Sequence, residues 1–277
     1  MSSEPAADPQ PPLVARIASR QSLVVGVAIF ALCALAWWWL WRMAAPAAQP
    51  MDGMAGMDMS SMPGMDMPMA AAPITPWSFA YLASTLLMWS IMMVAMMLPS
   101  AAPMILIHEV VSRKNRLSGK ATLAFGLSYL ALWVGFSALA ALAQAMLVST
   151  GVVAEASLAI GQERLTGLLL LAAGLFELSP LKQACLTWCQ SPVGFLTRYW
   201  RPGLSGAIGM GLRHGAFCIG CCWLLMLLLF VGGVMNLAWV ALLSLIVLAE
   251  KYLPAAWRVD RFLGALLILG GCVALLR

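Results

Sequence analysis

SLVVGVAIFALCALAWWWLW, residues 22–41, is a run of twenty residues without a charged side chain. About twenty apolar residues are what an α-helix needs to cross the hydrocarbon core of a bilayer. Similar runs fill most of the chain, in which 62% of residues are hydrophobic and only 10% are charged. A backbone in lipid must satisfy its own hydrogen bonds, which leaves helices or a closed β-barrel, and continuous apolar runs favour helices. The sequence therefore predicts an all-α, polytopic membrane protein.

Six further apolar runs follow the first. The seven candidate spans lie at residues 22–41, 78–98, 121–148, 164–180, 206–231, 236–253 and 260–276. If the N-terminus is cytoplasmic, only Arg42, Arg164 and Arg277 of the 16 Lys and Arg residues lie outside. The positive-inside rule then predicts a bundle of about seven helices with a cytoplasmic N-terminus and an external C-terminus. No basic block lies in a soluble region, so nucleic acid is not an expected partner.

The composition divides the chain into four parts. Residues 1–21 are expected to form a disordered cytoplasmic N-terminus, because they begin with a Pro/Ala-rich stretch. Residues 22–42 are expected to be a membrane anchor, 43–76 a Met-rich extracytoplasmic loop, and 77–277 a six-helix metal-binding membrane domain. A cleaved signal peptide is the alternative for the first run, but its length and its four tryptophans favour an anchor.

The segment MDGMAGMDMSSMPGMDMPM, residues 51–69, is dominated by methionine. Its eight methionines are Met51, Met54, Met57, Met59, Met62, Met65, Met67 and Met69. The segment has no periodic apolar face, so these side chains are not expected to fill a core. The thioether is a soft, uncharged donor that suits Cu(I) better than Zn²⁺, Mg²⁺ or Ca²⁺. The segment therefore indicates Cu(I) capture, and the alternatives are a biased linker or an oxidation sink.

The second span carries further methionines. Met88, Met92 and Met96 recur every four residues and fall on one helical stripe, while Met93 and Met97 form a pair on another face. Four of them, Met92, Met93, Met96 and Met97, are candidate metal ligands, with Met88 a weaker candidate. The alternative is that methionine serves as an apolar filler, which is common in helices.

The fifth span contains the only histidine that accompanies cysteines. His214, Cys218 and Cys221 are spaced i, i+4 and i+7, so they project from one helical face, with Cys222 at its edge. One imidazole and two or three sulfurs on one stripe can hold a soft or borderline metal ion. The alternative is that cysteines in an apolar context are inert small hydrophobic residues.

Cysteines also follow the fourth span. Cys185 and Cys189 share a face if the helix continues beyond Pro180, and we predict both as metal ligands. Glu177, an ionisable residue at membrane depth, is a weaker candidate for a ligand or for a partner of His214. In the expected topology the methionine, cysteine and histidine clusters all lie toward the cytoplasmic side.

Five motifs, in order, give the chain a resemblance from about Trp77 to the C-terminus. They are MMVAMMLPSAAPM (92–104), SPLKQACLTWCQSP (179–192), GMGLRHGAFCIGCCW (209–223), LLFVGGVMNLAWVALL (228–243) and LAEKYLP (248–254). This part of the chain resembles the bacterial family described as predicted metal-binding integral membrane proteins. The resemblance implies a multi-pass protein of the bacterial cytoplasmic (inner) membrane with a metal site, and it implies no particular reaction.

The favoured hypothesis is a membrane copper-handling protein that captures Cu(I) on the outer loop and binds or translocates it at the intramembrane Met/Cys/His site. Its expected partners are the copper ion, the lipid bilayer and a periplasmic copper carrier or membrane cuproenzyme. A metal-dependent membrane redox enzyme acting on a lipid-soluble substrate is one alternative, and a thiol–disulfide membrane protein is another. The chain has no phosphate-binding Gly-Lys-Ser/Thr motif, which disfavours pumping driven by ATP.

Overall fold

The computed structural model describes residues 20–44, 75–117, 119–153, 158–254 and 257–277. The described part is helical, apart from one isolated β-bridge between Val153 and Ile160. The helices are α2 (Arg20–Ala44), α3 (Phe79–Lys114), α4 (Gly119–Ser149), α5 (Glu163–Glu177), α6 (Pro180–Gln190), α7 (Pro192–Tyr199), α8 (Gly203–Leu227), α9 (Leu229–Gly232), α10 (Leu237–Tyr252) and α11 (Val259–Leu276). The expected N-terminal region and the Met-rich segment 51–69 lie outside the described residues, except for Arg20 and Gln21.

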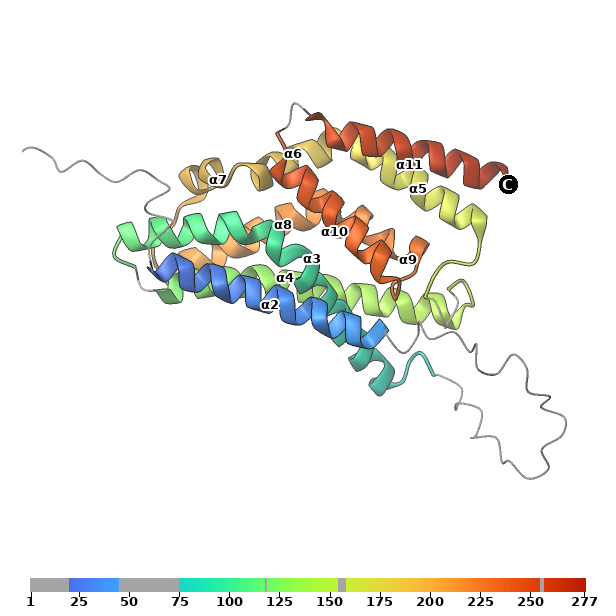
Figure 1. The fold of residues 1–277 in the computed structure, drawn as a ribbon, viewed down its shortest axis with the longest axis horizontal. Helices are drawn as coiled ribbons and strands as arrows, with labels where there is room; N and C mark the ends of the chain where they lie inside the picture. The colour runs from blue at the N-terminus through green and yellow to red at the C-terminus, as the bar shows by residue number, and fades with distance from the viewer. Residues whose placement is uncertain (1–19, 45–74, 118, 154–157, 255–256) are drawn as a thin grey trace, which may run out of the picture.

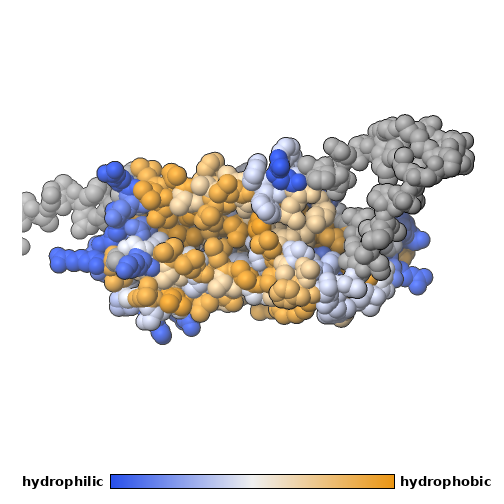
Figure 2. All heavy atoms as spheres, turned by 90° about the horizontal axis from the view of Figure 1, so that it is seen from below, coloured by the Kyte–Doolittle hydropathy of each residue, from blue (hydrophilic) through white to orange (hydrophobic). Residues whose placement is uncertain are grey.

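The helices pack side by side. Helices α2, α3 and α4 lie along one side of the bundle, α5 and α11 lie together at the opposite edge, and α8 and α10 run between them (Figure 1). Hydrophobic residues form a broad band between hydrophilic ends on the face drawn in Figure 2. Large apolar side chains such as Phe30, Leu139 and Phe262 are exposed on the surface. An exposed apolar band between polar ends is typical of a protein immersed in a bilayer.

The prediction of an all-α protein with several spans is confirmed, and the count of seven stays a prediction. Within the described residues, five helical segments are long and apolar enough to cross a membrane: α2, α3, α4, α8 together with α9, and α11. A sixth span results if α5 and α6, which are bent by 63° relative to each other, are counted together. The expected span at 236–253 corresponds to α10, whose 16 residues are fewer than the roughly 20 of a typical spanning helix.

Helix α3 is longer than the sequence suggested. It has 36 residues and continues through Pro99 and Pro103, whereas the predicted span ended at residue 98. Proline has no backbone N–H, so Pro103 leaves the carbonyl of Pro99 without its usual donor one turn later in the helix. The hydroxyl of Tyr252 donates to this carbonyl at 2.8 Å. A neighbouring helix therefore replaces the lost hydrogen bond, which allows α3 to continue.

The break between α5 and α6 has a local cause. Ser179 caps α6 by accepting a hydrogen bond from the Lys182 backbone N–H at 3.2 Å, and Pro180 occupies its first turn. The side chain of Lys182 is fully buried and donates to Glu177 at the end of α5 and to Glu250 of α10, at 2.7 Å for the latter. This Glu177–Lys182–Glu250 triad fixes the position of α6, which carries Cys185 and Cys189.

Two helix pairs approach closely at glycines. On α8, Gly211 packs against the backbone of Phe125 and the side chain of Ser128 on α4. On α5, Gly167 and Gly174 pack against the backbone of α11 near Gly271 and Gly264. Small residues at helix contacts let backbones come close, which is how membrane helices gain packing energy.

We expect Gly211→Ala to destabilise the bundle by about 1–3 kcal/mol, the usual cost of overpacking. A Cβ at Gly211 would collide with the Phe125 carbonyl and the Ser128 side chain, so α4 and α8 would have to separate. Thermal unfolding of the purified protein in detergent measures the effect. Gly209→Ala is the matched control, because a Cβ there meets no atom within 4 Å. Equal unfolding temperatures for the two variants would contradict the prediction.

Candidate metal site

A group of cysteines from two helices meets inside the bundle. The Sγ atoms of Cys189 on α6 and Cys221 on α8 are 3.9 Å apart. Cys218, one turn before Cys221, lies 3.2 Å from the Tyr129 hydroxyl of α4 and accepts a hydrogen bond from Lys251 Nζ of α10 at 2.9 Å. The three cysteines are buried. We call Cys189, Cys218 and Cys221 the cysteine centre.

Helix α3 contributes to the surroundings of the cysteine centre through its middle. The Tyr129 hydroxyl donates to the Met97 carbonyl at 3.1 Å, and Lys251 Nζ donates to Ser100 Oγ at 3.0 Å. Five helices, α3, α4, α6, α8 and α10, thus supply groups within two hydrogen bonds of Cys218. The predicted ligands Met92, Met93, Met96 and Met97 are all buried in the core.

The imidazole of His214 lies on the same buried side of α8 as Cys218, one turn earlier. It is surrounded by aromatic rings, with ring centroids 5.4 Å away for Phe195, 5.6 Å for Tyr129 and 6.1 Å for Phe125. Its Nδ1 atom is buried and has no hydrogen-bond partner among the described residues. Buried polar atoms are normally paired, so this unpaired nitrogen is a candidate ligand for a metal ion next to the cysteine centre.

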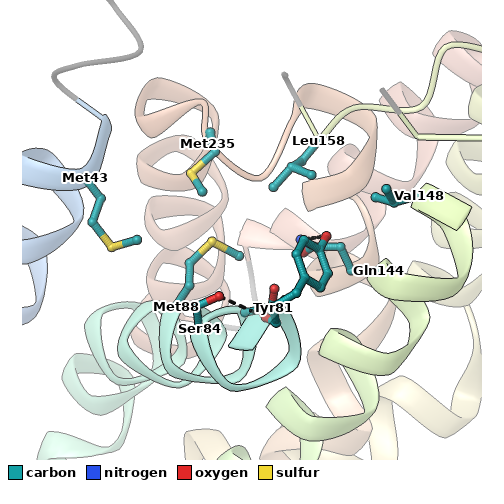
Figure 3. A pocket seen from close by; sticks show the side chains of 9 residues that line it. Met43, Tyr81, Ser84, Met88, Gln144, Val148, Leu158 and Met235 are labelled. Atoms are coloured by element: carbon teal, nitrogen blue, oxygen red, sulfur yellow. Dashed lines mark hydrogen bonds between the residues drawn. The ribbon is translucent and has the colours of Figure 1, made fainter. Parts of the chain in front are cut away.

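The remaining predicted metal ligands have different surroundings. Cys222 is buried, and its thiol donates to the Cys218 carbonyl at 2.8 Å. Cys185 is half-buried and packs against α8 at Gly220. Glu177 is held in an ion pair by Lys182. Met88 lines a separate cavity (Figure 3).

Two residues beside the cysteine centre were not predicted. Lys251 lies at the end of an apolar run, and an ionisable residue in such a position is itself a signal for a functional group at membrane depth. Tyr129 gives no signal in the sequence, because a tyrosine within an apolar run is typical of any spanning helix. Only the packing of α4 against α8 brings its hydroxyl to Cys218.

The arrangement offers sulfur pairs rather than a complete cage. Among the described residues, no three His, Cys, Asp or Glu side chains are placed to hold one metal ion together. With metal–sulfur bonds of about 2.3 Å, two sulfurs in a trigonal site are about 4.0 Å apart. The observed 3.9 Å between Cys189 and Cys221 matches that spacing. Thioethers and thiolates of this kind are soft donors suited to copper.

Fold and site together define a multi-pass membrane protein with a buried, sulfur-rich centre. Residues 86–274 match the protein family described as PpoB2, copper chaperone, and because this is more than half of the chain, the protein belongs to that family. Copper handling in the membrane is therefore confirmed as its function. The matched region contains every residue of the cysteine centre and begins after the Met-rich segment. No protein of established function and no solved structure matches the chain.

Proposed function

We propose that this copper-handling protein holds Cu(I) as its cargo at the cysteine centre. The supporting observation is the 3.9 Å separation of Cys189 and Cys221, which come from two different helices. These two sulfurs would be the first two ligands of a trigonal site. Cys218, one turn from Cys221, or a thioether of α3 would be the third after a change of side-chain rotamer. His214, Cys222 and Cys185 are further donors of the same group.

The charge of the site supports a monovalent cargo. Two thiolates binding one Cu(I) ion carry a net charge of about −1, which is costly to bury without a partner. Lys251 Nζ, 2.9 Å from Cys218, supplies a positive charge that makes the loaded site neutral. A hard divalent ion would instead favour carboxylate oxygens, and the buried carboxylates Glu177 and Glu250 are occupied by Lys182.

The route by which Cu(I) reaches the cysteine centre from outside is proposed from the sequence. We propose that the Met-rich segment 51–69 faces the outside and collects Cu(I), with the N-terminus in the cytoplasm and the C-terminus outside. The buried methionines of α3, Met92, Met93, Met96 and Met97, would lie between this segment and the cysteine centre. Delivery to a membrane cuproenzyme, or exchange with a periplasmic carrier, would complete the transfer in the bacterial cytoplasmic membrane.

One observation also favours a second function, thiol–disulfide exchange. Two thiols 3.9 Å apart can approach to form a disulfide, as expected of a thiol–disulfide membrane protein. The two functions differ in the effect of oxidation on copper binding, because a disulfide between Cys189 and Cys221 removes both copper ligands at once.

We expect a Cys189→Ser/Cys221→Ser variant to lose the copper that the wild-type protein retains after purification in detergent under reducing, copper-replete conditions. The reason is that serine hydroxyls are hard donors and do not replace thiolates for Cu(I). Elemental analysis of the purified protein gives the copper content per chain. The matched control is Cys33→Ser/Cys272→Ser, which removes the half-buried thiol of α2 and the exposed thiol of α11.

Undiminished copper in the double serine variant would exclude the cysteine centre as the binding site. A wild-type protein that binds no copper but forms a reversible disulfide between Cys189 and Cys221 would support the thiol–disulfide reading instead. Mass spectrometry after alkylation under oxidising and reducing conditions detects that disulfide.

A further inference from the structure

Three methionines from separate parts of the chain line one cavity beside the outer ends of α2 and α3. Met43 lies in the last turn of α2, Met88 lies on α3, and Met235 lies between α9 and α10. The cavity has a volume of about 190 Å³. Figure 3 shows the three thioether sulfurs directed toward the space between these elements. We call these residues the methionine pocket.

The methionine pocket has the donor chemistry of a site for a soft cation. None of the residues that line it is charged. The amide of Gln144 is already engaged, since it accepts from Trp89 Nε1 at 2.8 Å and donates to the Tyr81 hydroxyl at 3.2 Å. An uncharged pocket with three thioethers discriminates against hard divalent ions and favours Cu(I). A cation of single charge also costs less to hold there than a divalent one.

The three methionines differ in exposure in a consistent order. The side chain of Met43 is 38% exposed, Met235 is half-buried, and Met88 is only 5% exposed. An ion entering the pocket would therefore meet a solvent-accessible thioether first and a buried one last. A stepwise exchange of water for sulfur lowers the cost of removing the ion from water.

The position of the pocket links the two copper sites already proposed. The Met-rich segment 51–69 joins the end of α2 to the start of α3, and residues from both of those ends, Met43 and Tyr81, line the pocket. In the other direction, Met88 is followed at four-residue intervals by Met92 and Met96, which are fully buried. Each interval advances about 6 Å along the helix. The stripe leads along α3 toward Met97, whose carbonyl contacts Tyr129 at the cysteine centre.

We propose that Met43, Met88 and Met235 form an outer Cu(I) acceptor site, which receives the ion from segment 51–69 and passes it inward along α3. The proposal rests on the proposed copper function and adds a second binding site within the bundle. Binding at thioethers is weaker than at thiolates, so the ion can leave the pocket for the cysteine centre. A site on a transfer path needs such escapable binding.

The test isolates the pocket from the other two copper sites in the full-length protein. In a background with segment 51–69 replaced by a Gly/Ser linker and with Cys189→Ser, Cys218→Ser and Cys221→Ser, we expect one Cu(I) equivalent per chain, held by sulfur ligands. Adding Met43→Leu, Met88→Leu and Met235→Leu removes that equivalent, because leucine conserves volume but offers no donor. Titration with Cu(I) against a chromogenic chelator gives the stoichiometry, and X-ray absorption of the bound copper identifies sulfur ligands.

Met146→Leu and Met226→Leu in the same background are the matched control, since neither residue lines the pocket. Cu(I) stoichiometry that is unchanged by the three pocket substitutions would overturn the pocket proposal. That result would leave the cysteine centre intact as a proposal, because its own test uses the chain with all methionines present. In the opposite case, the three cysteine substitutions alone leave the affinity for every bound copper ion unchanged, while the pocket variant loses one copper equivalent. The pocket proposal would then stand, and the cysteine centre would be excluded as a copper site.

Discussion

Replacing Lys182 by methionine is expected to destabilise the protein by about 3–5 kcal/mol, the range seen when one partner of a buried ion pair is removed. The Lys182 ammonium is fully buried and is shared by Glu177 and Glu250, whose side chains are 1% and 2% exposed. Without the lysine, two carboxylates would face each other in an apolar interior. Thermal unfolding in detergent, followed by circular dichroism, should show a markedly lower midpoint.

The control for this prediction removes all three charges. In a Lys182→Met/Glu177→Gln/Glu250→Gln variant no unpaired charge remains, so most of the lost stability should return. Because the triad holds α6 against α5 and α10, the single variant should also retain less copper than wild type. A single variant that unfolds at the wild-type temperature would show that the lysine does not offset the two carboxylates.

Lys251→Gln is expected to weaken copper retention about 100-fold, which corresponds to about 3 kcal/mol. Two charges about 4 Å apart at an effective dielectric constant of about 20 interact with about 4 kcal/mol, and this attraction disappears with the ammonium. Glutamine keeps an N–H donor in place of the ammonium that donates to Ser100 at 3.0 Å, so the variant removes mainly the charge. Competition with a Cu(I) chelator measures the change in affinity.

Lys251→Arg separates charge from shape, since arginine keeps the positive charge with a different geometry. We expect it to retain more copper than Lys251→Gln. Lys114→Gln serves as the control for loss of a lysine charge, because this lysine lies in the last turn of α3. Equal copper affinities for the Lys251→Gln variant and wild type would mean that the charge of the loaded site is balanced by another group.

The periodicity of the sequence was enough to predict the buried face of α8. His214, Cys218 and Cys221 follow a spacing that places them on one side of any helix, and all three are buried as expected. Periodicity could not predict that α10 has only 16 residues, or that α3 passes through two prolines. The second outcome depends on Tyr252, which is 153 residues away from Pro99 in the chain and supplies the missing hydrogen bond.

The sequence also gave no basis for choosing which sulfurs meet. Cys185 and Cys189 share one face of α6, but only Cys189 is placed against Cys221. That choice depends on the 63° bend after α5 and on the triad that fixes it, which are features of packing between distant segments. The same limit applies to Met43 and Met235, which are unremarkable in the sequence and become neighbours of Met88 only in the folded bundle.

The contact between α5 and α11 has a consequence for how the protein is made. These two helices share the most extensive contact in the described structure, yet about eighty residues separate them along the chain. During synthesis α5 is therefore inserted long before its glycine face acquires a partner. Its 15 residues are too few to cross a bilayer unaided. Helix α11, which is synthesised after α5, thus completes the packing of α5 in the membrane, and a chain that lacks α11 should be a preferred target of membrane quality-control proteases.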